Sequence, residues 1–291
     1  MAFAPINGIY IYYEEHGRGA PIVFCHEFAG DDRSWAPQVR FFARRYRTIA
    51  FSARGYLPSS VLTEDAAYSE ERNVEDTYEL IRFLGIGPAH VVGLSMGGNV
   101  TLKLGLAHPE VCRSLVVAGA GYGSTNPAEF RANALETAAL MQQVGMAAFA
   151  ETYSHGPARL RFEQKDPAGF AEMVCHLKEH SPIGSALTMR NVQGKRKTIA
   201  EVADRLPGLE IPTLIVAGDE DELALEPSLM MKRLIPNSGL LIMPKTGHTI
   251  NLEEPAAFNQ AVLEFITAVD QGAWTPRRDT SIGLLPPEAK A

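Results

Sequence analysis

The amino-acid sequence predicts an α/β fold, in which a mostly parallel sheet of about eight strands is flanked by helices. The first observation is that short runs rich in β-branched and aromatic residues alternate with segments whose apolar residues follow a helical period. The second is that strand signals disappear between residues 121 and 210, where helical patterns continue alone. The composition, 46% hydrophobic and 21% charged, is typical of a globular protein with a full core.

Seven runs have the length and content of strands. The first two are too close together for a crossover helix, so we expect an antiparallel edge at the start of the sheet. The runs are residues 9–13, 22–25, 47–51, 90–93, 114–118, 213–217 and 239–243.

Helical periods lie between several of these runs and predict βαβ units with parallel strands. They are formed by Val74, Thr77, Tyr78 and Ile81, by Val100 and Leu104, and by Phe258, Val262, Phe265, Ile266 and Val269.

The chain is predicted to divide into a core, an insertion and a tail. Residues 1–120 and 211–270 form the α/β core, and residues 121–210 form an inserted helical cap with turn-rich borders. Within the cap, Phe170, Met173, Val174 and Leu177 follow an i, i+3, i+4, i+7 pattern. Residues 271–291 lose periodicity and are expected to form a tail.

Charge and hydropathy limit the partners. The formal net charge of −7 comes without a long basic cluster, which argues against binding to nucleic acid or to an anionic membrane surface. The sequence has no basic leader and no apolar run long enough to span a bilayer, so we expect a cytoplasmic protein. A small-molecule substrate is the expected partner, and assembly into a homo-oligomer is left open.

No residue pattern indicates a metal or a cofactor. Cys25, Cys112 and Cys175 are far apart and form no CxxC pair, and the histidines form no HExxH pattern. The glycine-rich stretch at 119–123 lacks the Lys-Ser/Thr ending of a phosphate-binding loop. We therefore expect chemistry that uses side chains alone.

One serine has the surroundings of a nucleophile. Gly93-Leu-Ser95-Met-Gly97 follows a predicted strand and precedes a predicted helix, which is the context of a nucleophile elbow. A sharp turn there exposes the hydroxyl, and the helix N-terminus favours developing negative charge. The alternative is a serine that merely caps the helix, and the acid and base described next favour the nucleophile instead.

An acid and a base follow in the order that such a serine requires. Asp221 ends the turn after the strand at 213–217, and His248 follows the strand at 239–243. We expect His248 to be the general base and Asp221 to orient it. The neighbours Asp219, Glu220 and Glu222 are expected to serve solvation or the loop.

With these motifs the sequence resembles the α/β-hydrolase fold family, in particular capped serine hydrolases that are similar to 3-oxoadipate enol-lactonases, esterases and haloperoxidases. The resemblance extends to about residue 270 and is carried by the turns at 25–30 and 52–59, the elbow at Ser95, the turn at 218–221 and the pair Gly247-His248. It implies that the backbone N–H groups of Phe28 and Met96 form an oxyanion hole.

The chain departs from the family pattern at two turns. The family usually has His-Gly-x-Gly where this chain has His26-Glu27-Phe28-Ala29, and Asp-x-Arg-Gly-x-Gly where it has residues 52–57. Two alternatives exist for Glu27: an outward carboxylate that is solvated or paired with an arginine, or a charge that faces the pocket and disfavours anionic substrates.

These residues predict a two-step acyl transfer. His248 takes the proton of Ser95, the serine attacks an ester, lactone or similar acyl carbonyl, and water releases the acyl-enzyme. The base must be neutral, so activity is expected to rise with pH through about 6.5. The alternatives are a C–C bond hydrolase, a lyase or a perhydrolase with the same triad, or a small-molecule receptor with little turnover.

Overall fold

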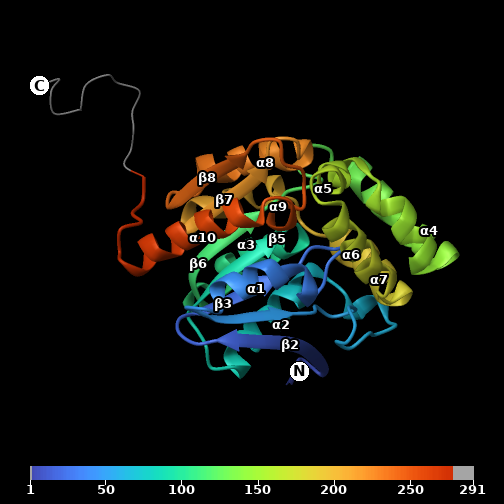
Figure 1. Cartoon of the computed structure of the whole chain (residues 1–291), viewed down its shortest axis with the longest axis horizontal. Coiled ribbons are helices and arrows are strands. Elements are labelled where there is room, and N and C mark those ends of the chain that lie inside the picture. Colours follow the sequence, from blue (N-terminus) through green and yellow to red (C-terminus); the bar gives the residue numbers. More distant parts are fainter. Residues whose placement is uncertain (1, 278–291) are drawn as a thin grey trace, which may run out of the picture.

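The computed structural model describes residues 2–277 and has one central sheet. Its 8 strands run in the order β1-β2-β4-β3-β5-β6-β7-β8, and all neighbours from β4 to β8 are parallel. The predicted fold class is therefore confirmed (Figure 1). The strands are β1 (Ala2–Ile6), β2 (Ile9–Gly17), β3 (Pro21–Cys25), β4 (Arg47–Phe51), β5 (Ala89–Leu94), β6 (Cys112–Ala118), β7 (Thr213–Gly218) and β8 (Ser238–Met243).

The antiparallel edge differs in detail from the expectation. β1 pairs with β2, and β2 pairs with β4 rather than with β3, which follows it in the chain. The sequence pattern did not predict β1. It joins β2 through Asn7 and Gly8, whose φ angles of 48° and 73° form a tight hairpin turn.

Helices cover both faces of the sheet because alternate strand residues point to opposite sides. Val23 and Val91 belong to the core shared with α2, α3 and α8, whereas Phe24 and Val92 belong to the core shared with α1 and α10. The bounds of these helices are α1 (Ala36–Phe42), α2 (Glu70–Phe83), α3 (Met96–Ala107), α8 (Glu222–Leu234), α9 (Ile250–Glu253) and α10 (Pro255–Asp270).

The segment between β6 and β7 is helical and will be called the helical segment, residues 127–208. Its longer helices lie together beside the sheet in Figure 1. Helix α4 changes direction at Gly145, whose φ of 74° is not helical. The elements are α4 (Pro127–Ser154), η4 (Pro157–Arg159), α5 (Leu160–Lys165), α6 (Pro167–Lys178), α7 (Pro182–Leu187), η5 (Thr188–Gln193) and η6 (Ala200–Gly208).

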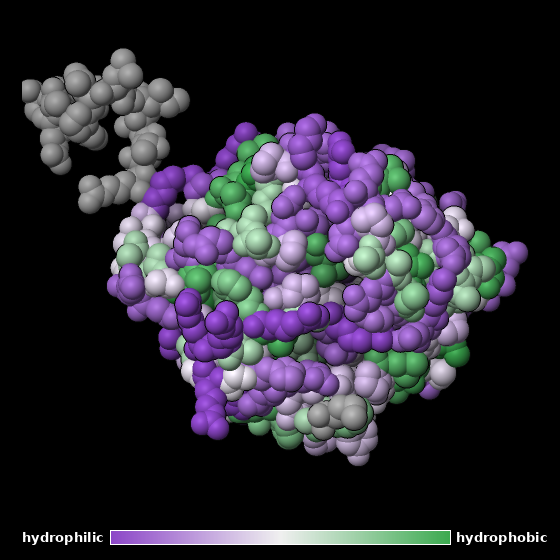
Figure 2. Space-filling model, in the orientation of Figure 1, coloured by the Kyte–Doolittle hydropathy of each residue, from purple (hydrophilic) through white to green (hydrophobic). Residues whose placement is uncertain are grey.

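The predicted tail, residues 271–291, is described only as far as residue 277, and residues 278–291 lie outside the described part. The described portion packs on the core, where the ring of Trp274 lies 4.7 Å from that of Phe265. On the surface shown in Figure 2, polar side chains surround scattered apolar ones. No helix among residues 2–277 has the length and apolar content needed to cross a membrane.

Candidate active site

Ser95 lies in the sharp turn between β5 and α3. Its φ of 55° and ψ of −110° are rare for a residue with a side chain, and such a conformation costs about 1–3 kcal/mol. Hydrogen bonds hold the turn: the backbone N–H of Ser95 donates to Ala118 O at 2.8 Å, and Asn99 Nδ2 donates to Ser95 O at 2.9 Å. The backbone is thus fixed in the geometry of a nucleophile elbow.

The two glycines of the motif allow the turn to pack closely. A Cβ atom on Gly93 would lie 2.2 Å from the carbonyl oxygen of Gly97, and one on Gly97 would lie 2.0 Å from the carbonyl oxygen of Cys25. Both distances are far below van der Waals contact. The absence of a side chain at Gly97 therefore brings the start of α3 against the end of β3.

Asp221 and His248 come together from the ends of β7 and β8. His248 Nδ1 lies 2.7 Å from Asp221 Oδ2, and both side chains are buried. A carboxylate only accepts, so Nδ1 carries the proton and Nε2 keeps the lone pair. The neighbouring acids have other partners, since Asp219 Oδ1 accepts from the Thr246 backbone N–H at 3.1 Å and Glu220 pairs with Arg161.

Ser95 and His248 both lie at the end of β6. The backbone of Ser95 is bonded to Ala118, and a Cβ atom on the next residue, Gly119, would lie 3.4 Å from Nδ1 of His248. The imidazole therefore lies over the chain that holds the elbow. Among the hydrogen bonds of residues 2–277, none joins Ser95 Oγ to His248, and in free enzymes such bonds often tighten only with substrate.

The surroundings of His248 raise its pKa above the usual 6.5. Burial alone lowers it, but the charge of Asp221 and the hydrogen bond to it favour the imidazolium, and Glu27 adds to this effect. Arg159 acts in the opposite direction. The base is thus expected to become neutral at a higher pH than the unperturbed value indicates.

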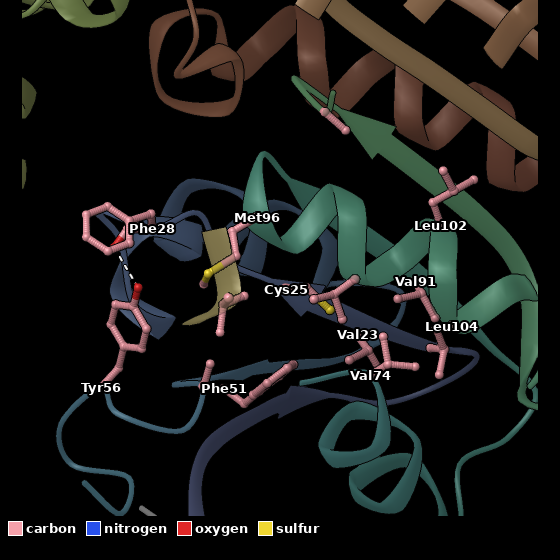
Figure 3. Packing of buried hydrophobic residues seen from close by; sticks show 14 of the residues in the cluster. Val23, Cys25, Phe28, Phe51, Tyr56, Val74, Val91, Met96, Leu102 and Leu104 are labelled. Atoms are coloured by element: carbon pink, nitrogen blue, oxygen red, sulfur yellow. Dashed lines mark hydrogen bonds between the residues drawn. The ribbon is translucent and has the colours of Figure 1, made fainter. Parts of the chain in front are cut away.

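Phe28 and Met96, the expected oxyanion donors, lie in the loop after β3 and at the start of α3. Met96 is the first residue of α3, and Phe28 follows β3 in the loop that Gly97 allows to approach. The Tyr56 hydroxyl donates to Phe28 O at 2.9 Å, the bond drawn dashed in Figure 3. Among the described residues, the backbone N–H groups of Phe28 and Met96 donate no hydrogen bond.

His26 fixes the loop that departs from the glycine-rich family pattern. Its Nε2 accepts from the Ala53 backbone N–H at 3.0 Å, so Nδ1 carries the proton and donates to Glu27 O at 2.7 Å. The ring is buried, and burial lowers the pKa of His26 to about 4. A neutral imidazole therefore links this turn to the loop after β4.

The carboxylate of Glu27 is buried, so the outward, solvated alternative does not hold. Its Oε2 accepts from Arg159 Nη2 at 2.5 Å, and Arg159 comes from η4 in the helical segment. The charge faces the interior near His248, but it is paired rather than free. The structure thus agrees with the alternative in which Glu27 pairs with an arginine, except that the carboxylate is buried and does not point outward.

Two residues of the site were missed from the sequence. Tyr122, after β6, donates its hydroxyl to Asp221 Oδ1 at 2.5 Å, and its ring lies 4.6 Å from that of His248. Arg159 is the other. Neither belongs to a recognisable motif, and the only available signal for Tyr122 was its position just beyond the strand next to the elbow strand.

The larger hollows lie away from these residues. One of about 630 Å³ is bordered by Tyr12, Asp32 and His180, whereas a space of about 10 Å³ lies beneath the elbow beside Met96 and Gly97. Ser95 is 8% exposed and His248 3% exposed. The candidate nucleophile and base are therefore nearly closed off from solvent.

No metal centre is evident in the described part of the chain. Residues 2–277 contain no group of three or more His, Cys, Asp or Glu side chains that could hold an ion. The three cysteines are free, and Cys25 and Cys112 are buried.

Comparison with known proteins identifies the family of the chain. The family described as the alpha/beta hydrolase fold matches residues 20–255. The chain belongs to this family. It is an enzyme of the α/β-hydrolase type.

Similar proteins include hydrolases of different kinds. The chain is 25% identical over 253 residues to (E)-2-((N-methylformamido)methylene)succinate hydrolase of Acinetobacter baylyi, covering 86% of this chain and 92% of that protein. A thermophilic esterase from Thermogutta terrifontis superimposes with a TM-score of 0.81 at 25% identity, covering 91% of this chain and 96% of the esterase. The enol-lactonase of Burkholderia xenovorans LB400 shares the fold at 21% identity and a TM-score of 0.80, covering 91% and 100%.

Proposed function

We propose that this enzyme is a serine hydrolase that cleaves a carboxylic ester, a lactone or a similar acyl bond of a small molecule. The observation that carries the proposal is the His248–Asp221 hydrogen bond of 2.7 Å beside a strained serine turn. An esterase and an enol-lactonase of the same fold agree with this reaction class.

In this proposal the free Nε2 of His248 accepts the proton of Ser95 while Oγ attacks the acyl carbonyl. The N–H groups of Phe28 and Met96 bind the oxyanion that forms. His248 then protonates the leaving group, and a water molecule attacks the acyl-enzyme with His248 again as base. Asp221 holds the imidazole in the required tautomer and stabilises its cation.

Turnover of 4-nitrophenyl esters of short acids tests the proposal. We expect repeated turnover by the wild type, and a loss of several orders of magnitude in kcat for Ser95→Ala. A burst of one equivalent without further turnover would point to a receptor. Equal rates for the wild type and Ser95→Ala would reject the serine as nucleophile.

A further inference from the structure

A buried ion pair joins the loop after β3 to the helical segment. Glu27 and Arg159 lie 132 positions apart, yet Oε2 and Nη2 are 2.5 Å apart and each side chain is only 4% exposed. Removing two charges from water carries a large desolvation penalty. A protein with hydrophobic residues in place of such a pair is often at least as stable. Stability alone is therefore a weak reason for this pair.

The pair lies beside the candidate catalytic groups. Glu27 directly precedes Phe28, the proposed oxyanion donor. On the other side, the backbone N–H of His248 donates to the carbonyl oxygen of Ala158, the residue before Arg159, at 3.2 Å. One partner is thus attached to the oxyanion loop and the other to the chain that contacts the base.

An aromatic cluster lies against the arginine of the pair. The guanidinium of Arg159 lies 4.8 Å from the ring centre of Tyr153, and that ring lies 6.0 Å from the ring of Phe28. Such surroundings screen charge poorly, so a charge on a bound molecule acts strongly on each partner. The guanidinium also has an unsatisfied donor, because its Nε is buried without a hydrogen-bond partner.

We infer that the Glu27–Arg159 pair determines the charge of the substrates that the site accepts, and that the balanced pair selects uncharged acyl compounds. The inference rests on the proposed function. A carboxylate on the substrate would be attracted by Arg159 but repelled by Glu27, and an ammonium group would meet the reverse. Neither charged group regains in the site the hydration free energy that it loses on leaving water, whereas an uncharged acyl chain has little hydration free energy to lose.

Removal of one partner should reverse this selection. The remaining charge would be buried without a counter-ion, so a substrate of opposite charge would supply one. Two unit charges about 8 Å apart, at an effective dielectric of about 20, interact strongly enough to change kcat/KM by about tenfold or more. The two single variants should therefore acquire opposite charge preferences.

The test compares 4-nitrophenyl hexanoate with the monoadipate and the 6-(trimethylammonio)hexanoate esters, after subtraction of spontaneous hydrolysis. Relative to hexanoate, Glu27→Gln should raise kcat/KM for the adipate ester by about tenfold or more. Arg159→Gln should do the same for the trimethylammonio ester. The double variant Glu27→Gln/Arg159→Gln should show neither gain, because no buried charge remains.

Arg161→Gln is the matched control. It removes an arginine of the neighbouring helix α5 that pairs with Glu220 and is partly exposed, so the charge preference should stay that of the wild type. If Arg159→Gln does not fold by circular dichroism, Arg159→Met replaces it, because methionine keeps the apolar stem without an unpaired polar group. Equal effects of each single variant on all three esters would overturn the inference.

Failure of the proposed function gives a different result. If the wild type cleaves none of the three esters, the hydrolase proposal fails, and the charge preference is then read from the Kd of each uncleaved ester. An NMR titration of the His248 ring adds a readout independent of turnover. We expect its pKa to fall in Glu27→Gln and to rise in Arg159→Gln, and an unchanged pKa in both would contradict the placement of the pair beside the base.

Discussion

Tyr122 and Asp221 share a hydrogen bond of 2.5 Å, in which the phenol donates to Oδ1 while Oδ2 accepts from His248. Both oxygens of the carboxylate are thus engaged. The phenol stays neutral, because burial and the charge of Asp221 raise the pKa of Tyr122 far above its usual value. A neutral donor on Oδ1 draws part of the negative charge away from the bond to His248.

Tyr122→Phe should therefore change the pH profile as well as the rate. Without the phenol, the charge of Asp221 acts more fully on His248, so its pKa should rise and the acid limb of kcat/KM should move to higher pH. We expect kcat/KM at its plateau to fall by about tenfold, as for loss of one hydrogen bond of about 1.4 kcal/mol. A lower rate with an unmoved acid limb would show that Tyr122 serves only packing.

The pH profile of the wild type should have its midpoint above the pKa of an isolated histidine. His248 must be neutral to accept the serine proton, and its pKa is raised. Thus kcat/KM should be low in acid and rise through an apparent pKa above about 6.5. Measurement of kcat/KM for an uncharged ester between pH 5 and 9 checks this, and a midpoint below 6.5 would contradict the assigned balance of charges.

Gly97 offers a test of the elbow that changes no catalytic side chain. Gly97→Ala introduces a Cβ atom 2.0 Å from Cys25 O, so the start of α3 must move away from β3. We expect a loss of about 2 kcal/mol or more in the free energy of unfolding, together with loss of most activity. Gly208→Ala is the control, since a Cβ atom there meets nothing within 4 Å. Similar urea midpoints for the two variants would contradict this packing.

The buried ring of His26 should make the protein less stable in acid. Its folded pKa of about 4 lies below the unfolded value of about 6.5, so the unfolded chain binds the proton first. The contribution of the neutral His26 ring to the free energy of unfolding is complete above pH 6.5. It is lost as the pH falls from 6.5 to 4, at about 1.4 kcal/mol per pH unit. In urea unfolding, His26→Asn should show a shallower slope in this window. Equal slopes for the wild type and His26→Asn would remove His26 from this role.

Much of the fold could be predicted because buried parallel strands have short, β-branched sequences that differ from helical periods. All seven expected runs are strands. β1 was missed because Pro5 interrupts a short run near the N-terminus, although Asn7-Gly8 is a recognised hairpin signal. The pairing of β2 with β4 could not be predicted, since strand order depends on contacts that no local pattern records.

The site was predictable only where a residue follows a strand in a known order. The structure places His248 and Asp221 in contact, and His248 and the backbone of Ser95 both lie at the end of β6. Tyr122 and Arg159 have no such signal, because their partners lie 99 and 132 positions away. For Glu27 the sequence offered pairing with an arginine as one alternative, but neither the burial of the pair nor the choice of Arg159 could be predicted, because this counter-ion comes from the helical segment.

Covalent labelling tests the central claim most directly, that Ser95 is the nucleophile. A fluorophosphonate should react with the wild type to one label per chain, and peptide mass spectrometry should locate the label on Ser95. Ser95→Ala should remain unlabelled while keeping the melting temperature of a folded protein. A label on any other residue, or ester turnover by an enzyme that takes up no label, would contradict the account.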